Sequence, residues 1–194
     1  MGLSLSPNEA RPFVVFALPR SRTAWLAHWL HAPEHPVGHD IVIECNHVKD
    51  FEQSFVHGMC GTVETGAIEG WRQIVKAIPG GRFLTVRRPL EEVTQSLARF
   101  GIEADEELAK REVMLDEIEA EGFAERVDFV DLRQRGCRKW IWEYLLPGIP
   151  FSLEHDELLA QINIQVDMQA RIMQLKARAV AMTLLKEELQ RAAN

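Results

Sequence analysis

The sequence predicts an α/β protein built on a mostly parallel sheet, with helices on both faces in a three-layer arrangement. Short apolar runs of strand character alternate with segments of helical period, as expected when crossover helices join parallel strands. The first run, 13-FVVFAL-18, is apolar throughout, as a strand buried on both faces should be. A chain of 194 residues suits one domain, which we expect to span residues 1–194.

The first half of the chain continues this alternation. An apolar segment with two tryptophans follows the first strand directly and is predicted to be helical. The sequence 62-TVETG-66 is placed at the end of a further strand. After the first strand we expect a helix over residues 24–31 and a short strand over 41–44. Two helices should follow, over 47–57 and 67–78, the second with the more regular period.

The second half begins with a second strong strand. Gly80 and Gly81 break the chain before it, and Pro89 suits the first position of the helix that follows. A tryptophan-rich segment, 139-KWIWEYLLPG-148, precedes the last helix. We expect a strand over residues 82–86, a helix over 90–99 and an acidic helix over 103–121. A strand over 127–131 and a long C-terminal helix over about 165–192 should follow.

Composition narrows the classes of function. A net charge of −7 argues against nonspecific nucleic-acid binding, which needs a positive field, but it leaves room for a local cationic pocket. No apolar run approaches the roughly 20 residues that span a bilayer, and the N-terminus lacks the pattern of a signal peptide. Three cysteines without metal-like spacing suggest a reducing interior. We therefore expect a cytoplasmic protein that binds neither nucleic acid nor membrane.

The turn after the first strand has the chemistry of an anion site. Ligands of parallel sheets bind beyond the carboxyl ends of the strands, where the turn 19–23 should lie. The N–H groups and dipole at a helix start attract anions, and the guanidinium groups of Arg20 and Arg22 fork onto phosphate or sulfate oxygens. Ser21 and Thr23 add hydroxyl donors, one of which could cap the helix. The glycines and lysine of the common triphosphate-binding loop are missing here.

The segment 19-PRSRTAWL-26 resembles the 5′-phosphosulfate-binding loop of sulfotransferases, commonly P-[KR]-[ST]-x-T-x-[WFL]-L. These enzymes use 3′-phosphoadenosine 5′-phosphosulfate (PAPS) as sulfuryl donor and have a P-loop NTPase-like fold. The resemblance implies that the loop from Arg20 to Ala24 binds the 5′ end of PAPS. Arg20 stands where many members have lysine, and arginine can stabilise the leaving phosphate but cannot protonate it.

A second segment, 84-LTVRRPLEEVTQSLARF-100, resembles the family's motif for the 3′-phosphate, in which a serine follows an arginine by eight residues. Counting back from Ser96 places the arginine at Arg88, with Glu92 and Val93 as the acidic-aliphatic pair. Arg87 is one step away, so the choice between the two arginines stays open. The resemblance covers residues 13–30 and 82–100.

Transfer of a sulfuryl group to an acceptor hydroxyl or amine also needs a general base, and no metal. The family often has a histidine or glutamate between the two motifs. Here the candidates are Glu44, His47 and Glu64, with His47 first and Glu64 second. His39 lies in a turn-like context that predicts no role. The sequence does not identify the small-molecule acceptor.

Two other functions remain open from the residues. A phosphotransferase with a divergent loop could hold Mg²⁺ at Asp131, and a domain of the same fold could lack turnover altogether. Trp140, Trp142 and Tyr144 are interpreted as helix core, with an acceptor pocket as the alternative. The apolar positions of the last helix indicate either internal packing or the seam of a homodimer; they are Ile164, Met168, Ile172 and Leu175.

Overall fold

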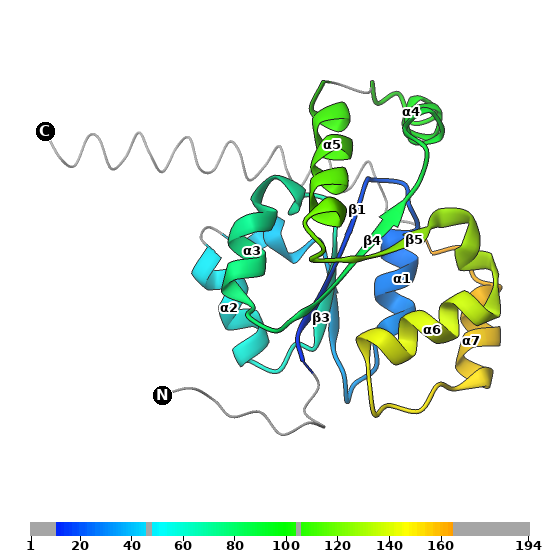
Figure 1. Cartoon of the computed structure of the whole chain (residues 1–194). Helices are drawn as coiled ribbons and strands as arrows, with labels where there is room; N and C mark the ends of the chain where they lie inside the picture. Colours follow the sequence, from blue (N-terminus) through cyan, green and yellow to red (C-terminus); the bar gives the residue numbers. More distant parts are fainter. Residues whose placement is uncertain (1–10, 46–47, 104–105, 165–194) are drawn as a thin grey trace, which may run out of the picture. The chain divides into compact units, whose positions relative to one another are not determined.

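The computed structural model describes residues 11–45, 48–103 and 106–164. Residues up to Ile164 belong to one compact unit. In it a parallel sheet lies between two layers of helices, as the sequence predicts (Figure 1). None of the helices in the described ranges has the length and apolar character that a membrane crossing requires.

The sheet in the described part of the chain has five strands in the order β2-β3-β1-β4-β5, and every pairing is parallel. The strands are β1 Phe13–Ala17, β2 Val37–His39, β3 Gly61–Glu64, β4 Arg82–Arg87 and β5 Glu125–Asp128. In the centre, Phe16 of β1 is in register with Glu64 of β3 and Thr85 of β4. The carboxyl ends of these strands therefore meet at one edge of the sheet.

The helices form two layers (Figure 1). The helix α1 Thr23–Leu30 lies with α6 Arg135–Leu145 and α7 Leu153–Ala160 on one face of the sheet. The other face is covered by α2 Val48–Val56, α3 Trp71–Ala77, α4 Leu90–Ala98 and α5 Glu106–Ala120. Short 3₁₀ helices connect these elements; they are η1 Ile41–Glu44, η2 Ile68–Gly70 and η3 Phe129–Arg133.

The strand β1 is apolar throughout because each face of it enters a different core. Phe13 and Val15 face the core under α1, α6 and α7, whereas Val14 and Phe16 face the core under the other helices. All five residues of β1 are fully buried. Trp142 is buried in the first core, which confirms its predicted packing role, whereas Trp140 is 40% exposed on the same helix.

The strand order places a topological switch point between β1 and β4. The chain leaves β1 through α1 toward β2 on one side, and it leaves β4 through α4 and α5 toward β5 on the other side. The two connections diverge, so a crevice opens between the carboxyl ends of these adjacent strands. The arginine-bearing turns after β1 and β4 both lie at this crevice.

One predicted strand was wrong, and the bounds of another were shifted. The apolar run 41–44 forms η1, and the edge strand lies earlier, at β2. Asp40 adopts a left-handed conformation with φ 53°, and Glu64 accepts hydrogen bonds from the N–H groups of Ile41 and Val42, so the run is held as a turn. The predicted strand 127–131 begins at Glu125 and ends at Asp128, where the chain winds into η3.

The bounds of this strand were predicted from its apolar residues, and that signal is weak in β5 because β5 lies at the edge of the sheet. Glu125, Arg126 and Asp128 are exposed, and only Val127 is buried, so the strand carries little of the apolar signal. The helix α7 was not predicted. The predicted C-terminal helix 165–192, with its dimer seam, lies outside the described residues.

A buried ion pair joins α6 to α7 and connects both helices to α1 and η3. Arg138 of α6 donates to both carboxylate oxygens of Asp156 of α7, at 2.6 and 2.8 Å, and Asp156 is fully buried. Trp29 of α1 donates its indole N–H to the same carboxylate at 3.2 Å. Arg138 also donates to the carbonyl oxygens of Leu132 and Arg133, so this network fixes η3.

Replacing Arg138 with methionine should lower the free energy of unfolding by about 3–5 kcal/mol, because Asp156 would stay buried with only the exposed Arg135 at 3.8 Å as a cation. Urea denaturation followed by circular dichroism measures the change. Lys139→Met is the matched control on the same helix, since Lys139 forms only an exposed ion pair with Glu143 at 3.7 Å. Equal stabilities of the two variants would contradict the prediction.

Candidate functional site

The turn between β1 and α1 has a strained backbone. Arg20 and Arg22 both lie in the left-handed region, with φ 67° and φ 59°, which costs residues other than glycine free energy. Ser21, between them, is fully buried, and its hydroxyl has no hydrogen-bond partner among the described residues. A buried hydroxyl without a partner is unfavourable, so the turn has the character of a site that a ligand completes.

The start of α1 is left open to an anion. Arg22 is the N-cap residue, and no side chain in the described part of the chain caps the helix. The expectation that Ser21 or Thr23 caps it was wrong, because Ser21 is enclosed in the turn and the Thr23 hydroxyl contacts His39. Ala24, also predicted to bind, lies in the first turn of the helix. N–H groups at such a start attract negative charge.

The turn after β4 contacts the turn after β1 directly. The Nη1 atom of Arg88 donates to the carbonyl oxygen of Arg20. Arg20 in turn donates from Nε to the hydroxyl of Ser96 on α4 at 3.2 Å. The three predicted residues are thus brought together at the switch point, although 76 positions separate Arg20 from Ser96.

Only one of the two adjacent arginines at the end of β4 faces the first turn. Arg87 points to α5, where it bonds Asp116 at 2.6 Å and lies 3.7 Å from Glu119. Arg88 instead lies 4.5 Å from the centre of the Phe129 ring and reaches Arg20. Of the two, Arg88 is therefore the one that faces the β1–α1 turn, although it also donates to Glu92 of α4 at 3.2 Å.

The arginines at this edge of the sheet are close enough to act on one another electrostatically. Burial, followed by the charge of Arg88, lowers the pKa of Arg20. Burial, followed by the charges of Arg133 and Arg138, lowers the pKa of Arg22. Arginine keeps its charge despite such shifts. We call Arg20, Arg22, Arg88 and Arg133 the cationic cluster; an anion would relieve its mutual repulsion.

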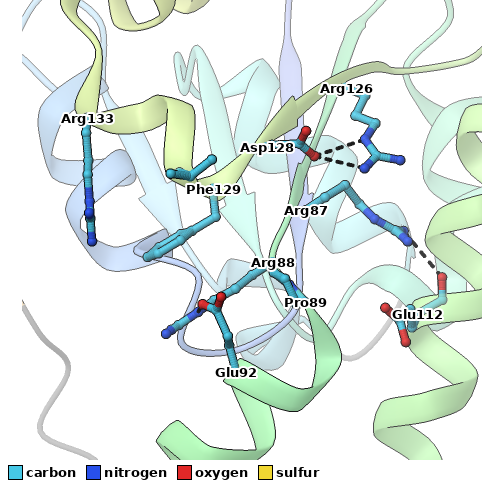
Figure 2. A pocket seen from close by; sticks show the side chains of 10 residues that line it. Arg87, Arg88, Pro89, Glu92, Glu112, Arg126, Asp128, Phe129 and Arg133 are labelled. Carbon is cyan, nitrogen blue, oxygen red and sulfur yellow. Dashed lines mark hydrogen bonds and ion pairs between the residues drawn. The ribbon is translucent and has the colours of Figure 1, made fainter.

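A pocket of about 420 Å³ opens beside the cationic cluster (Figure 2). It lies between the start of α4, the flank of α5 and η3. Its volume is in the range of small-molecule sites. The lining residues are Arg87, Arg88, Pro89, Glu92, Glu112, Arg126, Asp128, Phe129, Val130 and Arg133.

His39 lies on the other side of the turn, at the end of β2. Its Nε2 atom is 3.1 Å from the Thr23 hydroxyl and 3.6 Å from a carboxylate oxygen of Asp40. Asp40 accepts from the N–H and hydroxyl of Thr65, which fixes its orientation. Sequence reasoning missed His39 because no motif surrounds it; the parallel pairing of β2 with β3 brings it to this edge.

Glu64 is engaged in holding the turn after β2. It is fully buried and accepts from Thr62 at 2.6 Å and from the N–H groups of Ile41 and Val42 at 2.9 and 3.4 Å. Burial is the main cause that raises the pKa of Glu64 to about 8, although these donors oppose the shift. A proton acceptor must reach its substrate, and this carboxyl group is enclosed.

The other candidates receive no structural role. His47 and the side chain of Glu44 lie outside what the structure describes. Asp131 accepts from the side-chain amide of Gln134 at 2.7 Å. Within the described ranges, no group of three or more His, Cys, Asp or Glu side chains is arranged to hold a metal ion. Cys45, Cys60 and Cys137 form no disulfide with one another or with any other described residue.

Comparison with known proteins does not identify a family. No protein-family model matches the chain, and no curated protein matches it in sequence. The geometry of the site therefore carries the functional argument.

The protonation of Glu64 predicts a pH-dependent stability. A carboxyl group whose pKa is about 8 when folded and near 4.5 when unfolded stabilises the protein fully at low pH. This contribution is lost as the pH rises through the window between these values, by up to about 1.4 kcal/mol per pH unit.

We therefore expect the free energy of unfolding of the wild-type protein to fall more steeply between pH 5 and pH 8 than that of Glu64→Gln, as measured by urea denaturation. Glu34→Gln, at an exposed position, should keep the wild-type slope. Parallel slopes for wild type and Glu64→Gln would show that Glu64 is ionised throughout this range.

Proposed function

We propose that the protein is a sulfotransferase that moves a sulfuryl group from PAPS to a small acceptor hydroxyl or amine. The observation that supports this best is the contact between the two arginine-bearing turns. Arg88 donates to the carbonyl of Arg20, and Arg20 donates to Ser96, so the residues of both sulfotransferase-like motifs surround one crevice. A single ligand with an anionic group at each end fits this arrangement.

The 5′-phosphosulfate is assigned to the β1–α1 turn. Its oxygens would accept from the N–H groups at the start of α1 and from the guanidinium groups of Arg20 and Arg22. The buried hydroxyl of Ser21 has no partner among the described residues and could donate to the same group. Such fixed donors stabilise the negative charge that grows on the leaving phosphate.

The 3′-phosphate is assigned to Arg88 and Ser96. Ser96 lies on α4, two helical turns after Arg88, and its bond with Arg20 shows that this face of α4 is turned toward the crevice. Arg87 is excluded from this role because its guanidinium is engaged by α5. The nucleoside then falls beside Arg88, in the pocket of Figure 2.

In the transfer step, the acceptor oxygen or nitrogen attacks the sulfur atom. The bond between sulfur and the bridging phosphate oxygen breaks, and the acceptor proton passes to a base. We assign this role to His39, which lies against Thr23 at the start of α1. His47 and Glu64 remain the alternatives predicted from the sequence. Cysteines that form no disulfide among the described residues agree with a reducing compartment such as the cytoplasm, which stays a prediction.

Replacing Arg88 with alanine should weaken the binding of adenosine 3′,5′-bisphosphate roughly 10- to 100-fold, the loss expected for a charge-assisted hydrogen bond. Isothermal titration calorimetry measures it. Arg99→Ala, at an exposed position of the same region, is the control and should bind as the wild type does. Binding of ATP with Mg²⁺ in preference to the bisphosphate would favour the phosphotransferase and contradict the proposal.

Replacing His39 with alanine should lower kcat for sulfuryl transfer about 10²- to 10⁴-fold, as removal of a general base does. The affinity for adenosine 3′,5′-bisphosphate should change much less than kcat, because the imidazole is assigned to neither phosphate of the nucleotide. Transfer is measured from labelled PAPS to the best acceptor of a panel of phenols, sugars and amines. His57→Ala, at an exposed histidine, is the control. An unaltered kcat in His39→Ala would return the role to His47, since the carboxyl group of Glu64 is enclosed.

A further inference from the structure

The wall of the pocket in Figure 2 carries three carboxylates, of which two are paired. Glu92 accepts from Arg88 at 3.2 Å. Asp128 accepts from Arg126 at 2.9 and 3.1 Å. The carboxylate of Glu112 has no hydrogen bond or ion pair with any residue that the structure describes, whereas its backbone oxygen accepts from Arg87. One acceptor-only group is therefore presented to a ligand.

Besides Arg88, two of the cations that line the pocket are paired with acidic side chains, whereas Arg133 has no such partner in the described part of the chain. Arg87 and Arg126 are engaged by acidic side chains of α5 and β5. Arg133 has no side-chain partner among the described residues, and its charge acts on Arg22 in the β1–α1 turn. Figure 2 shows Arg133 and Glu112 on opposite sides of the pocket, with Phe129 and Arg88 between them. The pocket thus has a cationic end and an end with a bare carboxylate.

Between these ends the pocket offers apolar surface. Phe129, Pro89 and Val130 line it, and the Arg88 guanidinium lies 4.5 Å from the centre of the Phe129 ring. Flat aromatic groups bind well against such surfaces of rings and guanidinium planes. A nucleoside whose phosphate lies at Arg88 would extend its base over this surface.

We propose that Glu112 reads the base of the donor nucleotide by accepting a hydrogen bond from the exocyclic amino group of adenine. This inference rests on the proposed function, because it places the 3′-phosphate of the donor at Arg88. An ionised carboxylate can only accept hydrogen bonds. Adenine offers it an N–H donor, whereas hypoxanthine offers a carbonyl oxygen at the same position and would be repelled. Glu112 thereby selects amino-bearing bases.

Calorimetry with two nucleotides tests this assignment. Wild type should bind adenosine 3′,5′-bisphosphate roughly 10- to 100-fold more tightly than inosine 3′,5′-bisphosphate, the ratio expected for one hydrogen bond to a charged group. In Glu112→Gln the ratio should fall close to one, because the amide can rotate and donate to the inosine carbonyl. Glu117→Gln, which removes a carboxylate of the same helix that pairs with Arg72, should keep the wild-type ratio.

The outcomes separate the inference from the function on which it rests. Equal affinity of the wild type for the two nucleotides, or an unchanged ratio in Glu112→Gln, overturns the role of Glu112 and leaves the proposed function standing. If the wild type binds neither nucleotide, the proposed function fails and the inference fails with it.

Discussion

The hydrogen bond from Arg88 to the carbonyl oxygen of Arg20 is the contact on which the site depends. It joins two turns that follow adjacent parallel strands, and it helps to hold Arg20 in its left-handed conformation. It also brings two guanidinium groups close together. Burial, and after it the charge of Arg88, lowers the pKa of Arg20. The fold therefore holds like charges together at a point where an anion can enter, and the anion would supply the missing counter-charge.

The support for this arrangement comes from well outside the crevice. Arg138 and Asp156 form a buried pair, and Arg138 uses its remaining donors on the carbonyl groups that end η3. Since η3 carries Phe129 and Arg133, the pair fixes one wall of the pocket. Removing either partner would leave the other charge buried and poorly compensated. The stability of the helix core and the position of the η3 wall of the pocket therefore depend on the same pair.

The edge of the sheet is divided by charge. Glu64 and Asp40 lie at the ends of β3 and β2, where each accepts hydrogen bonds that shape the connecting turns. The cationic cluster follows β1 and β4 and extends to η3. An anionic ligand would be drawn to the cationic cluster, and His39, next to Asp40 and Thr23, lies at the border between the halves.

The sequence by itself determined the class of the fold. An apolar β1 and alternating strand and helix signals require a parallel sheet between two helix layers, because both faces of such strands must be covered. It also marked the two arginine-bearing turns, since charged residues directly after buried strands fall at the ligand-binding edge. Local pattern failed at 41–44 and at β5, where bonds from Glu64 and exposure at the sheet edge decide the conformation.

Only the tertiary structure decided which side chains meet. Spacing from Ser96 favoured Arg88 but left Arg87 open. The two differ in the structure because the acids of α5 engage Arg87, whereas Arg88 donates to Arg20 and to Glu92. His39 and Glu112 belong to no motif, and their positions follow from strand pairing and helix packing. Sequence pattern fixes which residues are buried on an element, whereas contacts across dozens of residues depend on how the elements pack.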